Sequence, residues 1–179
     1  MRPLFPSLHC GLLACLGLVL CAGPLAAQPS GPDTATYDAA DARFIKRAQA
    51  QTGTDKASLY QTLGFSYFRQ ENFDRAFLYF NAAVQANPRL YWSWYYLALL
   101  NLEDADAETY LKKAIVANQE FAPAYYWLGR YYGKRGMFEE AIRAFEGYLK
   151  SAWADPNEYG RTDEVRELLK KLRQGEKTE

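Results

Sequence analysis

The sequence predicts an all-α protein in which paired helices repeat along the chain and stack into a helix-turn-helix solenoid. The first supporting observation is self-similarity: a motif of aromatic-x2-Leu-Gly-x2-Tyr at residues 60–67 recurs 65 positions downstream at 125–132. The second is that each copy is followed by Ala-x3-Phe, at 76–80 and at 141–145. The third is that apolar residues recur three and four positions apart through these segments, as on one face of a helix. Such repetition is typical of a stacked array.

A middle copy lies between the two clear ones. Leu63 recurs 34 positions later as Leu97, whereas Ala76 recurs only 31 positions later as Ala107. From Ala107 to Ala141 the step is 34 again. The repeat length is therefore 34, and the middle unit lacks three residues around 102–104.

Small residues inside the predicted helices indicate close packing. Gly64 and Gly129 lie mid-helix, where Gly costs about 1 kcal/mol relative to Ala. We expect a neighbouring helix to approach closely there, with large aromatic side chains opposite. Ala76, Ala107 and Ala141 are the expected small partners on the second helices.

Turn and cap residues place the element boundaries. Asn72 and Gly136 mark tight turns within units, and Pro88 ends the first unit because it cannot continue a helix. A leading half-unit is expected as a helix over about 36–51, capped by Thr36. Its apolar stripe is expected to be Tyr37, Ala40, Phe44 and Ala48.

A further helix over about 162–174 has the composition of a terminal cap. Thr162 is the predicted N-cap, and acidic residues follow it against the helix dipole. One face is apolar and the other charged, as a capping element of a repeat array requires. The apolar face carries Val165, Leu168, Leu169 and Leu172. Residues 176–179 form a tail.

Residues 1–27 are predicted to be a secretory signal peptide. Arg2 is their only charge, an apolar run covers 11–22, and small residues follow up to Ala27. We expect cleavage after Ala27, a flexible linker over 28–35, and a periplasmic or extracellular mature chain with no membrane span. Two alternatives are an uncut N-terminal anchor and a lipid anchor on Cys15.

Removal of this segment would also remove most reactive groups. Cys10, Cys15, Cys21 and His9 all lie within it, so the mature chain would lack thiolate and imidazole ligands or nucleophiles. The acidic cluster of Asp104, Asp106 and Glu108 is typical of a helix N-terminus. With Arg2 removed, 20 basic residues (21 minus 1) face 21 acidic ones, which gives no basic excess for nucleic acid. We therefore expect no enzyme, no metal and no cofactor.

The repeat length and motif resemble the tetratricopeptide repeat (TPR) family, over residues 57–153 within a predicted domain of 36–175. The resemblance gives units at about 57–90, 91–121 and 122–153. The middle unit departs most, with Ala98 for the Gly, Asn101 for the Tyr and Leu111 for the Phe. In the third unit, Tyr148 replaces the last small residue.

The resemblance implies that the first helix of each unit lines a concave groove. The predicted partner-binding residues are Phe65, Phe68, Arg69, Trp92, Tyr95, Leu99, Tyr126, Arg130 and Lys134. Aromatic side chains with arginine are the types enriched at interaction hot spots. The resemblance thus implies a non-catalytic adaptor for a partner peptide or helix.

Several alternatives stay open from the sequence. The groove could be covered by the leading or capping helix of the same chain. It could bind carbohydrate on its aromatic rings, or receive a helix from a second copy in a homo-oligomer. One known TPR mode is not expected, because Gln61, Phe65, Tyr95 and Leu99 stand where carboxylate-clamping domains use Lys and Asn.

Overall fold

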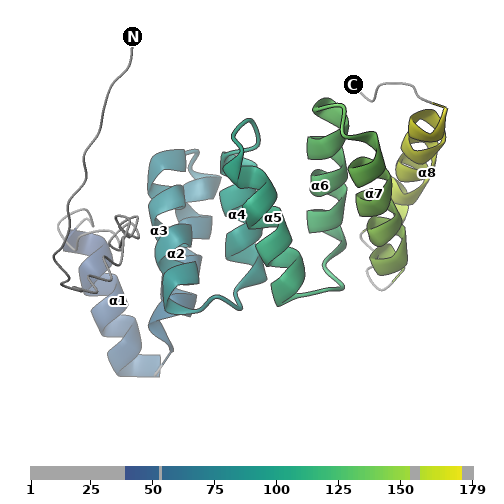
Figure 1. Ribbon diagram of the computed structural model, residues 1–179. Helices are drawn as coiled ribbons and strands as arrows, with labels where there is room; N and C mark the ends of the chain where they lie inside the picture. The colour runs from purple at the N-terminus through teal and green to yellow at the C-terminus, as the bar shows by residue number, and fades with distance from the viewer. Residues whose placement is uncertain (1–38, 53, 154–157, 175–179) are drawn as a thin grey trace, which may run out of the picture. The chain divides into compact units, whose positions relative to one another are not determined.

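Successive helices of this chain stand side by side in the order of the sequence (Figure 1). The structure, a computed structural model, describes residues 39–52, 54–153 and 158–174. Within these residues it contains eight helices and no strand. The helices are α1 (Ala39–Thr52), α2 (Lys56–Arg69), α3 (Phe73–Ala86), α4 (Tyr91–Leu100), α5 (Asp106–Ala117), α6 (Ala122–Lys134), α7 (Phe138–Ala152) and α8 (Tyr159–Arg173).

The helices pack as three pairs with one further helix at each end. The pairs are α2 with α3, α4 with α5, and α6 with α7. Each pair also packs against the next, while α1 packs on α2 and α8 on α7. All eight belong to one compact unit, Gly31–Glu179. The predicted solenoid of three units with a leading helix and a capping helix is confirmed.

The small residues of the repeat lie where helices approach most closely. A Cβ atom built on Gly64 would lie 2.7 Å from the Phe80 ring, and one on Gly129 would lie 2.6 Å from the Phe145 ring. Phe80 and Phe145 themselves are fully buried. Ala76, Ala107 and Ala141 are fully buried as well. The repeated Gly and Phe are therefore two halves of one contact within each pair.

The predicted turns within units are confirmed. The Asn72 side chain accepts a hydrogen bond from the Arg75 backbone N–H at 3.3 Å, which caps α3. Gly136 has a φ of +74°, a conformation that favours glycine. The predicted acidic start of α5 is also found, with Asp106 and Glu108 in its first turn.

The middle unit is shortened in its first helix. α4 has 10 residues, against 14 in α2 and 13 in α6. Two residues that follow or end the first helix of unit three bind the loop after α4, residues 101–105. Lys134 Nζ lies 2.6 Å from Glu103 Oε1, and Arg135 donates a hydrogen bond to the Glu103 carbonyl at 2.8 Å.

The capping helix begins earlier than predicted. α8 starts at Tyr159, with Glu158 as its N-cap residue, so Thr162 lies inside the first turn. Its hydroxyl donates to the Glu158 carbonyl at 3.4 Å. The start is set by Tyr148 of α7, whose buried hydroxyl donates to both the carbonyl and the carboxylate of Glu158. Tyr148 is also the residue that replaces the last small residue of the repeat pattern in the third unit.

The leading helix turns a partly different face to the core than predicted, although Ala48 of the predicted stripe does pack against the core. Ala40 is exposed and Phe44 is 44% exposed, whereas Asp41 and Ile45 are buried. Thr36 and Tyr37 lie outside the described residues. The buried aspartate explains the difference, because a polarity pattern assigns a carboxylate to the solvent side.

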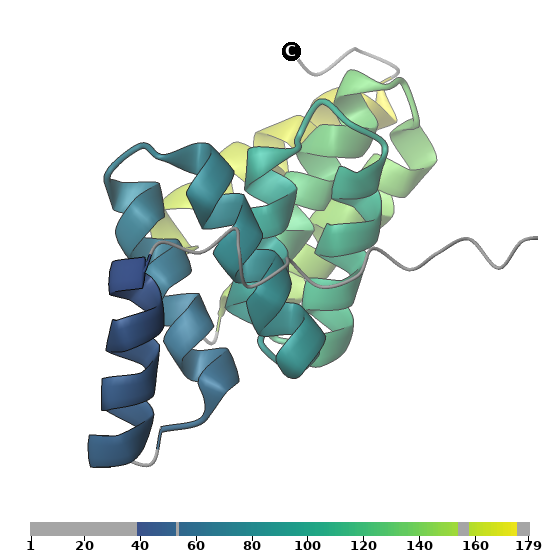
Figure 2. The ribbon, with the colours of Figure 1, turned by 90° about the vertical axis from the view of Figure 1, so that its left-hand side faces the viewer.

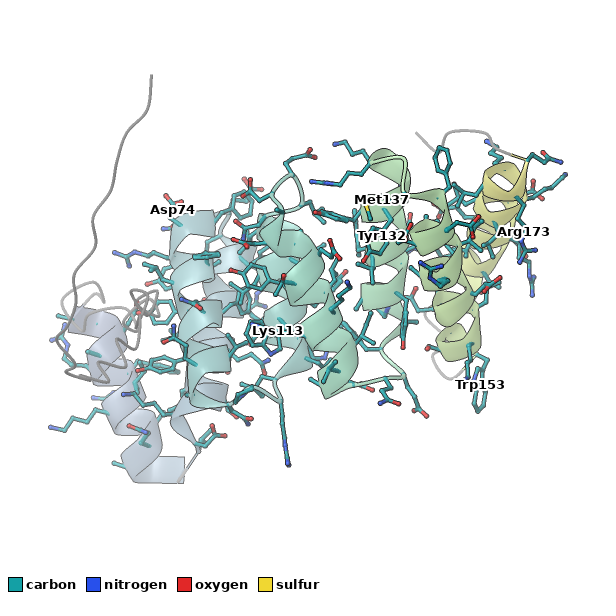
Figure 3. The ribbon with its side chains drawn as sticks, viewed as in Figure 1. Asp74, Lys113, Tyr132, Met137, Trp153 and Arg173 are labelled. Carbon is teal, nitrogen blue, oxygen red and sulfur yellow. The ribbon has the colours of Figure 1, made fainter. Side chains whose placement is uncertain are left out.

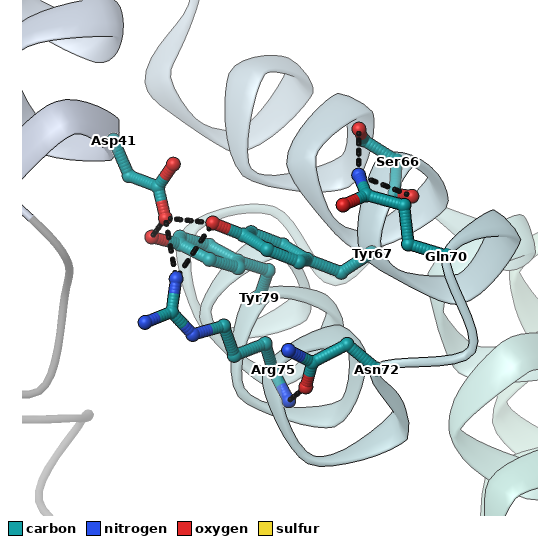
Figure 4. Close-up of polar contacts among 7 residues, drawn as sticks. All are labelled: Asp41, Ser66, Tyr67, Gln70, Asn72, Arg75 and Tyr79. Atoms are coloured by element: carbon teal, nitrogen blue, oxygen red, sulfur yellow. Dashed lines mark hydrogen bonds and ion pairs between the residues drawn. The ribbon is translucent and has the colours of Figure 1, made fainter.

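Asp41 is buried because it completes a polar network with unit one (Figure 4). Its carboxylate accepts hydrogen bonds from the hydroxyls of Tyr67 at 2.7 Å and Tyr79 at 2.5 Å. Arg75 lies 4.0 Å from the same carboxylate oxygen and donates to the Tyr67 hydroxyl at 2.8 Å. The network joins α1, α2 and α3 across the start of the array. Burial and the bond to Asp41 raise the pKa of Tyr67.

Through the described residues, no helix has both the length and the apolarity needed to cross a membrane. The predicted signal peptide, linker and tail, and the three cysteines, lie outside these residues.

Candidate binding surface

The first helices of units one and two lie side by side along the predicted groove. The Gln61 amide of α2 donates a hydrogen bond to the hydroxyl of Ser93 in α4 at 3.0 Å. Ser93 is fully buried, so this bond fixes the register of α2 against α4. The residues beside it on both helices therefore share one surface.

This surface contains a hollow of about 400 Å³. Its lining consists of Thr62, Phe65, Phe68, Arg69 and Tyr96. The Tyr96 ring centre lies 4.7 Å from that of Phe68 and 5.1 Å from that of Phe65, both edge to face. These contacts are the geometry that aromatic pairs prefer, so the walls of the hollow hold one another in place.

Trp92 extends the aromatic surface beyond the hollow. Its ring centre lies 6.2 Å from Tyr96 and 4.7 Å from Phe121, and 38% of the residue is exposed. Trp94, two positions later, has a structural role instead. Its indole N–H donates to the Pro88 carbonyl at 2.8 Å, and its ring stacks on Tyr110. Trp94 is thus half-buried and packs against the core, whereas Trp92 is exposed.

Tyr95 and Leu99 do not line the hollow. Both are half-buried, as Phe65 and Phe68 are. The Tyr95 hydroxyl accepts a hydrogen bond from the Trp127 indole, and burial raises the pKa of Tyr95 to about 12. Tyr95 therefore forms the boundary between the open surface and unit three.

α8 buries Tyr126 and pairs Arg130 with one of its carboxylates, which corrects the prediction that both are free on the open surface. Tyr126 is only 7% exposed, and its hydroxyl donates to Glu164 at 2.7 Å. Arg130 lies 3.7 Å from the same carboxylate, and the Arg161 guanidinium lies 4.7 Å from the Tyr126 ring centre. Burial and the bond to Glu164 raise the pKa of Tyr126. In Figure 2, α8 crosses obliquely behind the helices nearest the viewer.

Lys134 is also engaged within the chain. Both oxygens of Glu103 accept from its ammonium group, at 2.6 and 2.9 Å. This contact lowers the pKa of Glu103. Of the nine predicted residues, Phe65, Phe68, Arg69 and Trp92 share the open surface, which we call the α2–α4 surface together with Thr62 and Tyr96.

Sequence reasoning missed Thr62 and Tyr96. The Tyr96 ring stacks on the buried Phe80 ring, with 5.1 Å between the ring centres. Tyr96 also lines the hollow, because its half-buried ring has one side against Phe80 and the other towards the hollow. The repeat itself could have identified these two residues. Each directly precedes the repeated Leu, Thr62 before Leu63 and Tyr96 before Leu97, and both line the hollow.

A larger hollow of about 690 Å³ is lined by residues of α5, α6 and α7 and by Met137. Tyr132 and Met137, labelled in Figure 3, contribute to its lining. Its charged residues are paired with one another: Lys112 with Glu108 at 2.6 Å and Arg143 with Glu140 at 2.9 Å. The Tyr132 hydroxyl also donates to Glu108. This hollow therefore offers no unmet charge to a ligand.

Comparison with known families identifies the repeat. Models described as tetratricopeptide repeat match residues 57–90 and residues 110–143. The chain carries tetratricopeptide repeats. The first match spans α2, α3 and the following turn, whereas the second begins within α5 and ends within α7. Comparison with curated proteins gave no significant match.

Solved structures, two of them of TPR domains, share the fold. The first TPR of Spaghetti (RPAP3), bound to an HSP90 peptide, is 24% identical, with 66% of this chain and 91% of that chain covered and a TM-score of 0.55. The TPR2B domain of yeast Sti1, in a complex with pHsp70, is 17% identical, with 66% and 97% covered and a TM-score of 0.56. The CopN–Scc3 complex gives 16% identity, 79% and 82% coverage and a TM-score of 0.57.

Proposed function

We propose that this protein is a non-catalytic adaptor that binds a segment of a partner protein on the α2–α4 surface. The observation that carries the proposal is the hollow lined by Phe65, Phe68 and Tyr96, which opens beside the exposed Trp92. Exposed aromatic surface of this kind marks interaction sites. Two of the structurally similar TPR domains were solved with chaperone-derived peptides, which supports peptide binding as the general mode.

The surface is short, because α8 occupies the corresponding part of unit three. Contacts of Glu164 and Arg161 with Tyr126 close it at that end. The partner segment therefore spans two first helices, α2 and α4, and its affinity depends on a few buried side chains. Burial of apolar area at about 25 cal/mol per Å² supplies the main favourable term.

The polar lining favours a peptide over a carbohydrate. Sugar recognition needs convergent carboxylate or amide groups beside the rings, and the described lining offers only the hydroxyls of Thr62 and Tyr96 and the guanidinium of Arg69. Binding to a polysaccharide with no protein partner would contradict the proposal.

The test compares two tryptophans of similar chemistry. Trp92→Ala should weaken capture of a partner by about 2 kcal/mol or more, the usual scale of a hot spot. Trp153→Ala removes a 71% exposed tryptophan from the end of α7 and serves as the matched control. Affinity for the captured partner and a melting curve are measured for both. If Trp92→Ala unfolds the protein as badly as Trp94→Ala, the binding role fails.

We also propose that the adaptor acts outside the cytoplasm. The support is the sequence of residues 1–27, with one charge, an apolar run and small residues before Gln28. The intact mass and the thiol content of the protein isolated from the envelope fraction test this. A mature chain that begins at Gln28 and has no thiol is expected. A lipid on Cys15 or an intact N-terminus would contradict it.

A further inference from the structure

We propose that the partner segment presents a carboxylate next to a large apolar side chain, and that Arg69 binds the carboxylate while the hollow takes the apolar group. This inference rests on the proposed function and specifies the ligand at the same surface. Three features of the α2–α4 surface support it: an apolar hollow, one unpaired cation at its side, and the neutralisation of the neighbouring cations.

The hollow suits an aromatic or branched aliphatic side chain. Three of its lining residues are aromatic, and no carboxylate or amide of the described residues lines it. The Phe65 ring lies against both Phe80 and Tyr96, at 5.3 and 5.1 Å between ring centres. These ring contacts keep Phe65 in place, so the hollow exists before a ligand binds. A preformed hollow reduces the entropy lost on binding.

Arg69 is the one charged residue of this lining. It lies at the end of α2 and is exposed. Within the described residues, no ion pair or hydrogen bond joins its side chain to another group. Its guanidinium therefore reaches solvent beside the three rings with its donors unused.

The other cations predicted for the groove differ from Arg69 in this respect. Arg130 faces Glu164 at 3.7 Å, and Lys134 faces Glu103 at 2.6 Å. Arg161, which α8 adds to the same side, pairs with Glu158 at 2.9 Å. In the described part of the chain, a carboxylate faces each of these three cations and none faces Arg69, so we assign the carboxylate partner of Arg69 to the ligand.

Guanidinium chemistry makes this assignment specific. Arginine presents planar donors that match the two oxygens of a carboxylate, and a bidentate pair fixes orientation as well as charge. Rim charges of this kind govern association rate and specificity more than total affinity. A carboxylate beside the apolar anchor would therefore select among partners that share similar apolar side chains.

The experiment starts from random peptides displayed on phage and selected on the purified full chain. Peptides enriched by the wild type should carry Asp or Glu beside an aromatic or aliphatic residue. Fluorescent copies of one such peptide, and of its acid-to-Lys version, are then titrated against four proteins. These are the wild type, Arg69→Glu, Trp92→Ala and the control Arg143→Glu, which makes the same charge change on the outer face of α7.

Arg69→Glu should weaken binding of the acidic peptide about five- to tenfold, the scale of one exposed charge-assisted contact replaced by a repulsive one. It should strengthen binding of the Lys peptide, whereas Arg143→Glu should change neither. If peptides bind in a Trp92-dependent way without preference for an acid, the proposed function stands and this inference is wrong. If no peptide depends on Trp92, both are wrong.

Discussion

Gly64 and Gly129 show how one repeated residue can indicate both the repeat fold and a close contact between its helices. Each leaves room for an aromatic ring from the partner helix, Phe80 in one pair and Phe145 in the other. Because the repeat places glycine and phenylalanine at a fixed spacing, the contact could be predicted without coordinates. The energetic importance of this contact can be measured with a single substitution at the glycine.

Gly64→Ala should lower the free energy of unfolding by about 1–2 kcal/mol net. The new methyl group would lie 2.7 Å from the buried Phe80 ring, and this overpacking exceeds the gain of about 1 kcal/mol in helix propensity. Gly160→Ala is the matched control, since no atom lies within 4 Å of its added Cβ. Chemical denaturation gives the free energy of unfolding of both variants and tests this prediction. Equal stability of the two would show that the ring moves freely.

Tyr148 illustrates a residue whose role could not be predicted. It departs from the repeat by filling a small-residue position, and the pattern alone marks it only as an exception. The structure shows that its hydroxyl binds Glu158 at the start of α8. Burial raises the pKa of Tyr148 well above its usual range. Exceptions to a repeat are thus informative, but their contacts depend on segments far from the pattern.

Among the helices, α1 and α8 were predicted to exist, and cover of the groove by one of them was an open alternative, but the face that each buries was not predicted. Helical periodicity and cap residues report local preferences, whereas the face that a helix buries depends on its neighbour. α1 buries a carboxylate that two tyrosine hydroxyls satisfy, against the usual pattern. α8 reaches across to Tyr126, which the repeat assigned to the groove.

Asp41→Asn should loosen α1 while the rest of the array stays folded. The carboxylate accepts two tyrosine hydroxyls and lies near Arg75, and hydrogen bonds to a charged group contribute about 1.5–3 kcal/mol. Hydrogen exchange should accelerate in α1 and remain unchanged in α6 and α7. Arg43→Gln on the exposed side of α1 is the control. Unchanged protection of α1 in Asp41→Asn would show that the apolar contacts of Ile45 and Ala48 are enough to hold the helix.

At the scale of the whole molecule, the sequence predicted the array better than the surface. Repeat length, unit number and pair contacts follow from spacing, since each unit contacts only its neighbours. The open surface depends on how the array ends, and α8 ends it over unit three. Phe65, Phe68, Arg69 and Trp92 remain together because no such helix covers units one and two in the described residues.

The array is held together by a small number of contacts between units. Unit one meets unit two through a buried cluster of Ala76, Phe80, Val84 and Leu97. Leu97 is the fully buried member that α4 contributes. Units two and three and α8 share a separate, larger cluster that includes Leu111. Leu97 is therefore a main contact that couples the unfolding of unit one to that of the remaining units.

Leu97→Ala should divide unfolding into two steps. Loss of a buried leucine costs about 2–5 kcal/mol, and here the loss falls on the interface between unit one and the remainder. α2 and α3 should then exchange their amide hydrogens at lower denaturant than α6 and α7. Leu111→Ala removes an equally buried leucine from α5 and should destabilise the protein similarly without separating unit one. Coincident exchange of all four helices in Leu97→Ala would mean that the interface extends beyond this cluster, and that units one and two unfold as a single body.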